Sequence, residues 1–376
     1  MKRKITSLLS EMVKISSVYP AEIKMALFIE KLLRKTGYIV TKQYVDSKRY
    51  NLIVEKGYGK KSVMFYSHLD TVGIVDGWKQ DPFALHIVGD KAYGIGAWDM
   101  KGGMAVSLLA FITHQPKNIK LKMVFCVDEE NISLGGHVLA RSPFIDDVEC
   151  VISTEPAFFY GNQGIVIGRP GRAVYRINIE GKPKHYALYD PKEDISIFTG
   201  ELIIDLKKIN LTAASKKQFV FVRSTETTIQ GMSTPQKIIL ELDSSILPPN
   251  SHSQILKKIK SSAIKINSKY RNYFTIDAGF VKRDTPFLEG YEIKKPNDYL
   301  KIMEKTIKKT TGKKAVPYFR SSIADENIFG YMGKTVLGIG AVGGNAHSYQ
   351  EWVSLGSLEK LYNILTDFLT NTDNTI

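Results

Sequence analysis

Short apolar runs separated by helical patterns dominate the first 155 residues of the chain. The runs with the length and the polar flanks of buried strands are NLIVEKG, SVMFYSHLD, LKMVFCVDEE and CVISTEP. Residues 20–37 and 100–114 instead place apolar residues at helical spacing. Strands that alternate with helices are typical of a sheet covered on both faces. The pattern therefore predicts an α/β fold, a three-layer domain with a mixed, mostly parallel sheet.

The pattern changes near Gly168. From there the chain contains stretches that alternate apolar and polar residues, such as VYRINIEGKP and QKIILELDSS, with two helical patterns between them. This texture is typical of an α+β unit whose sheet is exposed on one face. Because the α/β pattern then returns, we expect one discontinuous domain at 1–168 and 287–376, and an inserted α+β domain at 169–286.

Composition argues against a membrane or secreted protein. No apolar stretch approaches the roughly 20 residues of a membrane helix, and the N-terminal segment has the spacing of an amphipathic helix rather than a signal peptide. Two cysteines, Cys126 and Cys150, are too few for a disulfide framework. We therefore expect a cytoplasmic protein with no membrane partner.

The formal net charge of +14 comes mostly from lysine. In SQILKKIKSSAIKINSKYR the lysines fall between apolar helical positions, as on the solvated face of a helix. No zinc-finger, arginine-rich or aromatic-plus-basic pattern accompanies them. We expect no nucleic-acid partner, whereas an acidic protein or an anionic substrate stays open.

Acidic residues and histidines gather where the predicted strands end. Each could be an ordinary solvated strand end, but active groups of open α/β sheets cluster at the carboxyl ends of strands. The residues at these ends, or in the glycine-rich turns nearby, are His68, Asp70, Asp99, Glu129, Glu130, Glu155 and His347. Their convergence on one edge of the sheet predicts a functional site.

Imidazole and carboxylate ligands suit zinc and also accommodate cobalt or manganese. Two ions could share a site if one carboxylate bridges them, and Asp99 is the natural bridge because glycines flank its turn. Of the adjacent pair Glu129 and Glu130, one could bind metal and the other act as general base. His68 and Asp70 lie on one face of a strand, so Asp70 can hold one imidazole nitrogen while the other faces a ligand.

Five motifs, SHLDTV, GIGAWDMKGG, DEEN followed by LGG, STEP, and AHSYQEWV, occur in an order and spacing that resemble one family. That family contains acetylornithine deacetylase, succinyl-diaminopimelate desuccinylase, aminoacylase and glutamate carboxypeptidase. The resemblance covers the chain from about residue 5 to its end. It implies a catalytic domain with two divalent ions, most commonly zinc, and an inserted lid that often forms a homodimer.

The resemblance also implies roles for individual residues. One ion would be held by His68, Asp99 and Glu155, and the other by Asp99, Glu130 and His347. Glu129 matches the family's general base, and Asp70 matches the aspartate that orients the first histidine.

Two further candidates are tied to the inserted lid and to substrate binding. His185, in EGKPKHYAL, matches a lid histidine that stabilises the oxyanion, but a lid-surface histidine is an equally good interpretation because the following residues depart from the motif. Ser245 stands where many relatives have an arginine, which puts an inherited contact with a substrate carboxylate in doubt. Arg320 could bind an α-carboxylate through its planar fork, or it could be structural.

The resemblance implies a metal-dependent hydrolase that cleaves the amide bond of N-acyl amino acids, like acetylornithine deacetylase or succinyl-diaminopimelate desuccinylase. A carboxypeptidase or dipeptidase acting on short peptides is the nearest alternative. Release of an amino acid from an acidic carrier protein would suit the positive charge. A non-catalytic binding protein is the remaining alternative, and the complete set of ligands and base argues against it.

Overall fold

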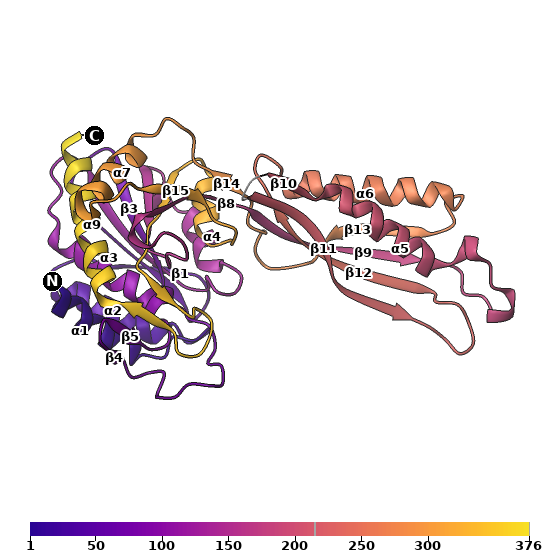
Figure 1. The fold of residues 1–376 in the computed structure, drawn as a ribbon, viewed down its shortest axis with the longest axis horizontal. Helices are drawn as coiled ribbons and strands as arrows, with labels where there is room; N and C mark the ends of the chain where they lie inside the picture. Colours follow the sequence, from indigo (N-terminus) through magenta and orange to yellow (C-terminus); the bar gives the residue numbers. More distant parts are fainter. Residues whose placement is uncertain (214–215, 376) are drawn as a thin grey trace. The chain divides into compact units, whose positions relative to one another are not determined.

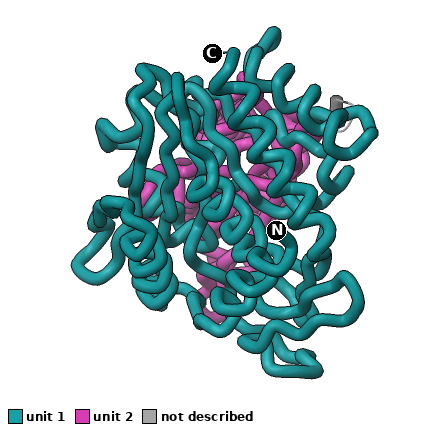
Figure 2. The backbone as a smooth tube through the Cα atoms, turned by 90° about the vertical axis from the view of Figure 1, so that its left-hand side faces the viewer, with its two compact units in different colours: residues 1–168, 293–318, 324–376 teal, residues 169–292, 319–323 magenta. Residues whose placement is uncertain are grey.

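The computed structural model describes residues 1–213 and 216–375 and divides into two compact units. The first comprises Met1–Gly168, Ile293–Tyr318 and Ala324–Ile376, and the second comprises Arg169–Glu292 and Phe319–Ile323 (Figure 2). The α/β prediction is confirmed for the first unit, which combines a mixed sheet with packed helices (Figure 1).

The main sheet of the first unit has the strand order β1-β2-β6-β3-β7-β16-β8, and β15 pairs with β8. The strands are β1 (Thr41–Tyr44), β2 (Tyr50–Lys56), β3 (Ser62–His68), β6 (Lys120–Cys126), β7 (Val148–Ser153), β8 (Gly164–Arg169), β15 (Val316–Phe319) and β16 (Thr335–Gly338). The four central strands, β6, β3, β7 and β16, run parallel, whereas β1, β2 and β8 are antiparallel to their neighbours. Every residue of β3 is buried, so helices cover both of its faces.

The helices of this unit are α1 (Lys2–Val13), α2 (Ile23–Lys35), α3 (Gly102–Thr113), α4 (Leu134–Ala140), α7 (Asp298–Thr311), α8 (Glu326–Tyr331) and α9 (Leu355–Thr375). Helix α3 contacts β3 and packs against α1 and α9, and α4 contacts β2 and packs against α8. Local signals fix their ends. Asn297 caps α7 by accepting from Leu300 N at 3.0 Å, and Gly312 ends it at φ +70°. None of the helices within the described residues combines the length and apolar character needed to cross a membrane.

A second, small sheet of the first unit has the order β17-β18-β5-β4. Its strands are β4 (His86–Val88), β5 (Lys91–Tyr93), β17 (Gly343–Gly344) and β18 (Trp352–Ser354). Trp352 pairs with Tyr93, so this sheet joins the segment before Asp99 to the segment that carries His347. The remaining short helical turns are η1 (Ala97–Lys101), η2 (Pro143–Ile145), η3 (Gly161–Gln163), η4 (Tyr186–Leu188), η5 (Pro191–Glu193) and η6 (Lys207–Ile209).

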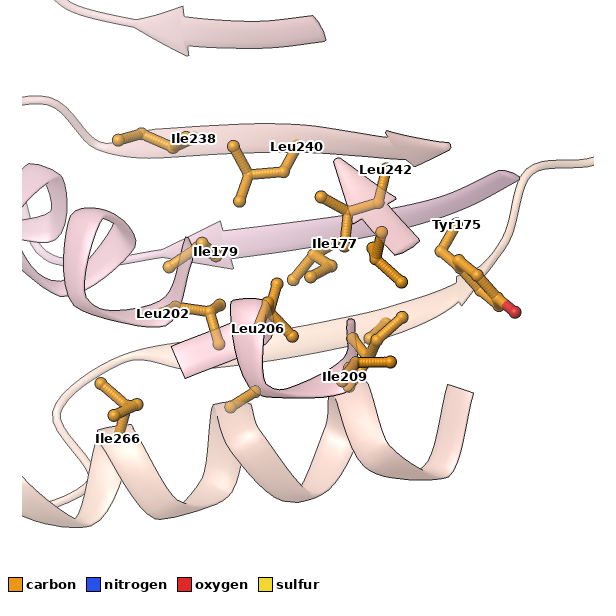
Figure 3. Packing of buried hydrophobic residues seen from close by; sticks show 14 of the residues in the cluster. Tyr175, Ile177, Ile179, Leu202, Leu206, Ile209, Ile238, Leu240, Leu242 and Ile266 are labelled. Atoms are coloured by element: carbon orange, nitrogen blue, oxygen red, sulfur yellow. The ribbon is translucent and has the colours of Figure 1, made fainter. Parts of the chain in front are cut away.

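The second unit is a sheet of order β10-β11-β12-β9-β13 with two helices on one face. Its elements are β9 (Gly171–Glu180), α5 (Ile195–Leu206), β10 (Leu211–Ala213), β11 (Lys216–Thr228), β12 (Lys237–Ile246), α6 (His252–Lys269), β13 (Thr275–Phe280) and β14 (Tyr291–Glu292), the last at the point where the chain leaves the unit. Figure 3 shows the core, where Ile177 and Leu240 of the sheet face Leu202 of α5 and Ile266 of α6.

The second unit extends beyond the insertion expected from the sequence. The chain returns to the first unit at Ile293 rather than at residue 287, and the later segment Phe319–Ile323 also belongs to the second unit. Side-chain contacts account for this difference. Lys216 pairs with Glu292 and lies 4.6 Å from the Phe319 ring, and Arg169 donates to Ser322 Oγ at 3.0 Å. Such contacts join segments far apart in the chain and leave no local pattern in the sequence.

Candidate metal centre

The parallel strands of the main sheet bring the predicted site residues to one edge. Strand β3 ends at His68, β6 ends at Cys126 just before Glu129, and β7 ends at Ser153 just before Glu155. Because β3 lies between β6 and β7 and is parallel to both, these carboxyl ends meet.

The first group of converging side chains is His68, Asp99 and Glu155. His68 Nε2 lies 3.4 Å from Asp99 Oδ1 and 3.3 Å from Glu155 Oε1, and all three residues are buried. None of these three atoms has a hydrogen-bond partner of acceptable geometry within the described part of the chain. Buried polar atoms without partners are costly. One cation among them would satisfy all three.

The second group is Asp99, Glu130 and His347. His347 Nε2 lies 3.2 Å from Asp99 Oδ2 and 3.0 Å from Glu130 Oε1. Asp99 therefore belongs to both groups and uses a different carboxylate oxygen in each. Ligand atoms that surround zinc tetrahedrally at about 2.0–2.1 Å are spaced about 3.3 Å apart. The spacings in both groups are close to this value, so the residues fit two ions bridged by Asp99.

The charge of the site also favours cations. Two histidines are surrounded by five carboxylates, those of Asp70, Asp99, Glu129, Glu130 and Glu155. Burial raises the pKa of Glu129 well above 4.5; the neighbouring His68 opposes this rise, and the like charges of Glu155 and Glu130 add to it. Contacts with Asp99 and Glu130 raise the pKa of His347 to about 11. Divalent ions would offset this crowding of negative charge.

Glu129 forms a third group of converging side chains with His68 and Glu130, but it is not a member of the two groups that share Asp99. It is within 4.8 Å of His68 and Glu130, counted between potential ligand atoms, and its side chain is partly exposed. A carboxylate beside two metal positions that is not needed as their ligand is available for proton transfer.

Asp70 contacts His68 through its main chain as well as its side chain. His68 Nδ1 lies 3.0 Å from the backbone carbonyl oxygen of Asp70 and 3.6 Å from its carboxylate Oδ1. The carboxylate of Asp70 accepts hydrogen bonds from Glu129 N at 3.2 Å and Glu130 N at 2.8 Å. Asp70 thus contacts the histidine through both its main chain and its side chain, and its side chain also fixes the backbone of the two glutamates.

Two supporting groups escaped the sequence analysis. Arg49 Nη1 contacts the buried carboxylates of Asp128 at 3.0 Å and Glu22 at 3.2 Å, next to the glutamate pair. Glu351 accepts hydrogen bonds from the backbone of the segment that carries Asp99. Neither Arg49 nor Glu351 ends a predicted strand. In the sequence, the only hint was that the acidic residue Glu351 lies inside the motif AHSYQEWV.

The two remaining candidates, His185 and Arg320, belong to the second unit. His185 is exposed, its Nδ1 accepts from Ala187 N at 3.3 Å, and its ring centre lies 4.7 Å from that of Tyr186. The Arg320 side chain is buried, with 4% of its surface exposed. Ser245 lines a hollow of about 420 Å³ in this unit with Arg172, Asp243 and Phe219.

The sequence profile described as peptidase family M20/M25/M40 matches residues 64–371, most of the chain. The chain belongs to this family. Members of the M20 family are hydrolases that act on carbon–nitrogen bonds.

Individual relatives of the M20 family agree with this placement. A probable succinyl-diaminopimelate desuccinylase of Staphylococcus aureus is 28% identical over 190 residues, which cover 49% of this chain and 46% of the relative. The chain thus matches about half the length of such curated relatives. The succinyl-diaminopimelate desuccinylase of Helicobacter hepaticus is 23% identical over 403 residues, 96% of each chain. The crystal structure of aminopeptidase PepT from Bacillus cereus is similar in fold, with a TM-score of 0.81, 16% identity and 98% of each chain covered.

Proposed function

We propose that this M20 protein hydrolyses the amide bond of a small N-acyl amino acid with the help of two divalent metal ions. The observation that carries the proposal is the shared carboxylate of Asp99, which offers one oxygen to each of two ligand groups. The proposed ions are zinc, with cobalt or manganese as alternatives that the same ligands accept.

The proposed ligands follow the two groups. His68 and Glu155 would complete the first ion's site with Asp99, and Glu130 and His347 the second. Two such ions would lower the pKa of the attacking water molecule and would polarise the carbonyl of the substrate.

In the proposed mechanism, Glu129 accepts the proton of the attacking water. Its carboxylate then carries that proton to the nitrogen of the departing amine, so one residue acts first as base and then as acid. The water oxygen forms a bond to the carbonyl carbon, the amide carbon–nitrogen bond breaks, and the products are a carboxylic acid and an amine that carries the proton delivered by Glu129. Asp70 holds the backbone of Glu129 during both transfers, which keeps the carboxylate in reach of the water and the amine.

The substrate class is the finer part of the proposal. Similarity to two desuccinylases supports an N-acyl amino acid. The fold of an aminopeptidase is the specific observation in favour of a second candidate, the hydrolysis of short peptides.

The test is hydrolysis of a substrate panel by zinc- or cobalt-loaded protein. The panel holds N-acetylornithine, N-succinyl-diaminopimelate, other N-acyl amino acids and several dipeptides. The wild type should cleave one class, and Glu129→Gln should lose about 10²- to 10⁴-fold in kcat while retaining its metal. Cleavage of peptides alone would select the second candidate. Equal rates for the variant and the wild type would refute the mechanism.

The inserted unit supplies three further parts of the proposal. If His185 stabilises the oxyanion, His185→Ala should lower kcat by about 10²- to 10³-fold with unchanged metal content. If Arg320 binds a substrate carboxylate, Arg320→Lys should raise KM, because lysine lacks the planar fork. We also propose a homodimer formed through this unit, which sedimentation of the protein tests.

Free, buried Cys126 and Cys150 are compatible with the proposed cytoplasmic location.

A further inference from the structure

Glu351 has a buried carboxylate that accepts several backbone hydrogen bonds from a single segment. Its Oε2 accepts from Gly96 N at 2.7 Å, and its Oε1 accepts from Trp98 N and Asp99 N, both at 2.8 Å. Its carbonyl oxygen accepts a fourth bond, from Gly94 N at 3.1 Å. Only 3% of the residue is exposed. Hydrogen bonds to a buried charged acceptor are among the stronger ones in proteins.

The segment that Glu351 holds is the one that presents Asp99. Gly96, at φ +70°, starts a turn in which Asp99 departs from helical geometry, with φ −115° and ψ 93°. A second anchor comes from Trp98, whose indole Nε1 donates to Ala341 O at 2.8 Å. The backbone of Asp99 is therefore fixed from outside its own turn.

Glu351 also lies four residues after His347, in the segment that leads into β18. One short stretch of chain thus carries a proposed ligand of the second ion and the carboxylate that fixes the shared ligand. The strand pairing of β18 with β5 holds this stretch beside the Asp99 segment.

We propose that Glu351 is a positioning residue of the metal centre, which sets the backbone of Asp99 so that its two oxygens meet two ions. This inference rests on the proposed function, because it needs metal ions at the two ligand groups. Partners behind metal ligands typically contribute 10- to 100-fold in metal affinity. Since Asp99 is shared, the loss of Glu351 should weaken both ions rather than one.

A purely structural role is the competing explanation, and the chain offers a matched control for it. Asp373 is a buried carboxylate in α9 that also accepts three backbone hydrogen bonds, from Lys117 N at 2.7 Å, Asn118 N at 2.7 Å and Ile119 N at 3.0 Å. Its segment carries none of the proposed ligands. Asp373→Asn therefore removes the same kind of interaction without touching the metal centre.

The experiment compares wild type, Glu351→Gln and Asp373→Asn by titration of the metal-free proteins with zinc, by the metal content of the loaded proteins, and by the visible absorption of the cobalt-loaded proteins. Glu351→Gln should lower the affinity for both ions by about 10- to 100-fold and change the cobalt absorption. Asp373→Asn should reduce the melting temperature but keep the metal affinity within about twofold. Where Glu351→Gln does not fold, Glu351→Asp serves in its place, because it keeps the charge but shortens the reach.

The outcomes separate the two proposals. Wild-type protein that binds no zinc or cobalt would refute the proposed function. Wild-type protein that binds two ions, with the same affinity and the same cobalt spectrum in the Glu351 variant, would overturn the positioning role alone. An equal loss of affinity in Asp373→Asn would also overturn it, because general destabilisation would then explain the effect.

Discussion

Replacing Glu129 by glutamine should stabilise the metal-free protein although it abolishes the proposed chemistry. Burial raises the pKa of Glu129 well above 4.5, against the opposing charge of His68 and with support from Glu155 and Glu130. A carboxyl group whose pKa is raised in the folded protein binds a proton more tightly in the folded state than in the unfolded state. Its cost to stability is absent below pH 4.5 and grows as the pH rises towards the folded-state pKa.

The size of the effect follows from this linkage. Each tenfold difference in proton affinity between the folded and the unfolded protein corresponds to about 1.4 kcal/mol of stability. Glu129 is partly exposed, and solvent reduces the cost. We therefore expect Glu129→Gln to raise the free energy of unfolding of the chelator-treated protein by an amount on the order of 1 kcal/mol at pH 7.

The assay is urea unfolding of metal-free wild type and variant at several values between pH 5 and pH 8. The difference should increase with pH, whereas Glu226→Gln, at an exposed position of β11, should stay within about 0.5 kcal/mol of wild type throughout. The reasoning would be refuted by a variant that is less stable than wild type, or by a difference in stability that does not depend on pH. Either result would show that burial and like charge do not raise the pKa of Glu129.

Other perturbations probe the same site. Because contacts with two carboxylates raise the pKa of His347 to about 11, this histidine carries a proton in the metal-free protein at neutral pH. Zinc binding should then release at least one proton and weaken from pH 8 to pH 6, as calorimetry in buffers of different ionisation enthalpy would show. Zinc at 100 times its dissociation constant should stabilise the protein by about 2.7 kcal/mol per ion, and chelation should reverse this in a thermal melt. Gly340→Ala would place a methyl group 2.0 Å from the carbonyl oxygen of Glu155. This substitution should destabilise the fold by about 1 to 3 kcal/mol and lower kcat/KM. The control is Gly200→Ala, whose added methyl group meets no atom within 4 Å and should change neither quantity.

The sequence predicted the parts of the site that depend on buried strands. An apolar run followed by polar residues marks the end of such a strand, and this rule led to His68, Glu129 and Glu155. Their meeting at one edge depends on parallel pairing of β3 with β6 and β7, which the alternation of helices and strands made the natural expectation. The fold class was predictable for the same reason.

The rest depends on contacts that leave no local pattern. The small sheet that places Asp99 beside His347 is built from strands of two or three residues, too short for any periodicity. The carboxylate of Asp70 lies 3.6 Å from His68 Nδ1, as expected, but it also accepts hydrogen bonds from two backbone N–H groups of a loop about 60 residues away in sequence, which no local pattern shows. Glu351 was missed because its partners are backbone groups, which every residue has.

The position of the insertion in the chain imposes an order on the assembly of the centre. His68, Asp99 and Glu155 all precede the second unit, whereas His347 follows it. On a ribosome, the first ligand group is complete when residue 155 has been made, but the second must wait for nearly the whole chain. A nascent chain that binds metal could therefore fill the first ligand group before the second one exists. The second ion would link the two ends of a long loop, and the cell's supply of metal would govern the final step of folding.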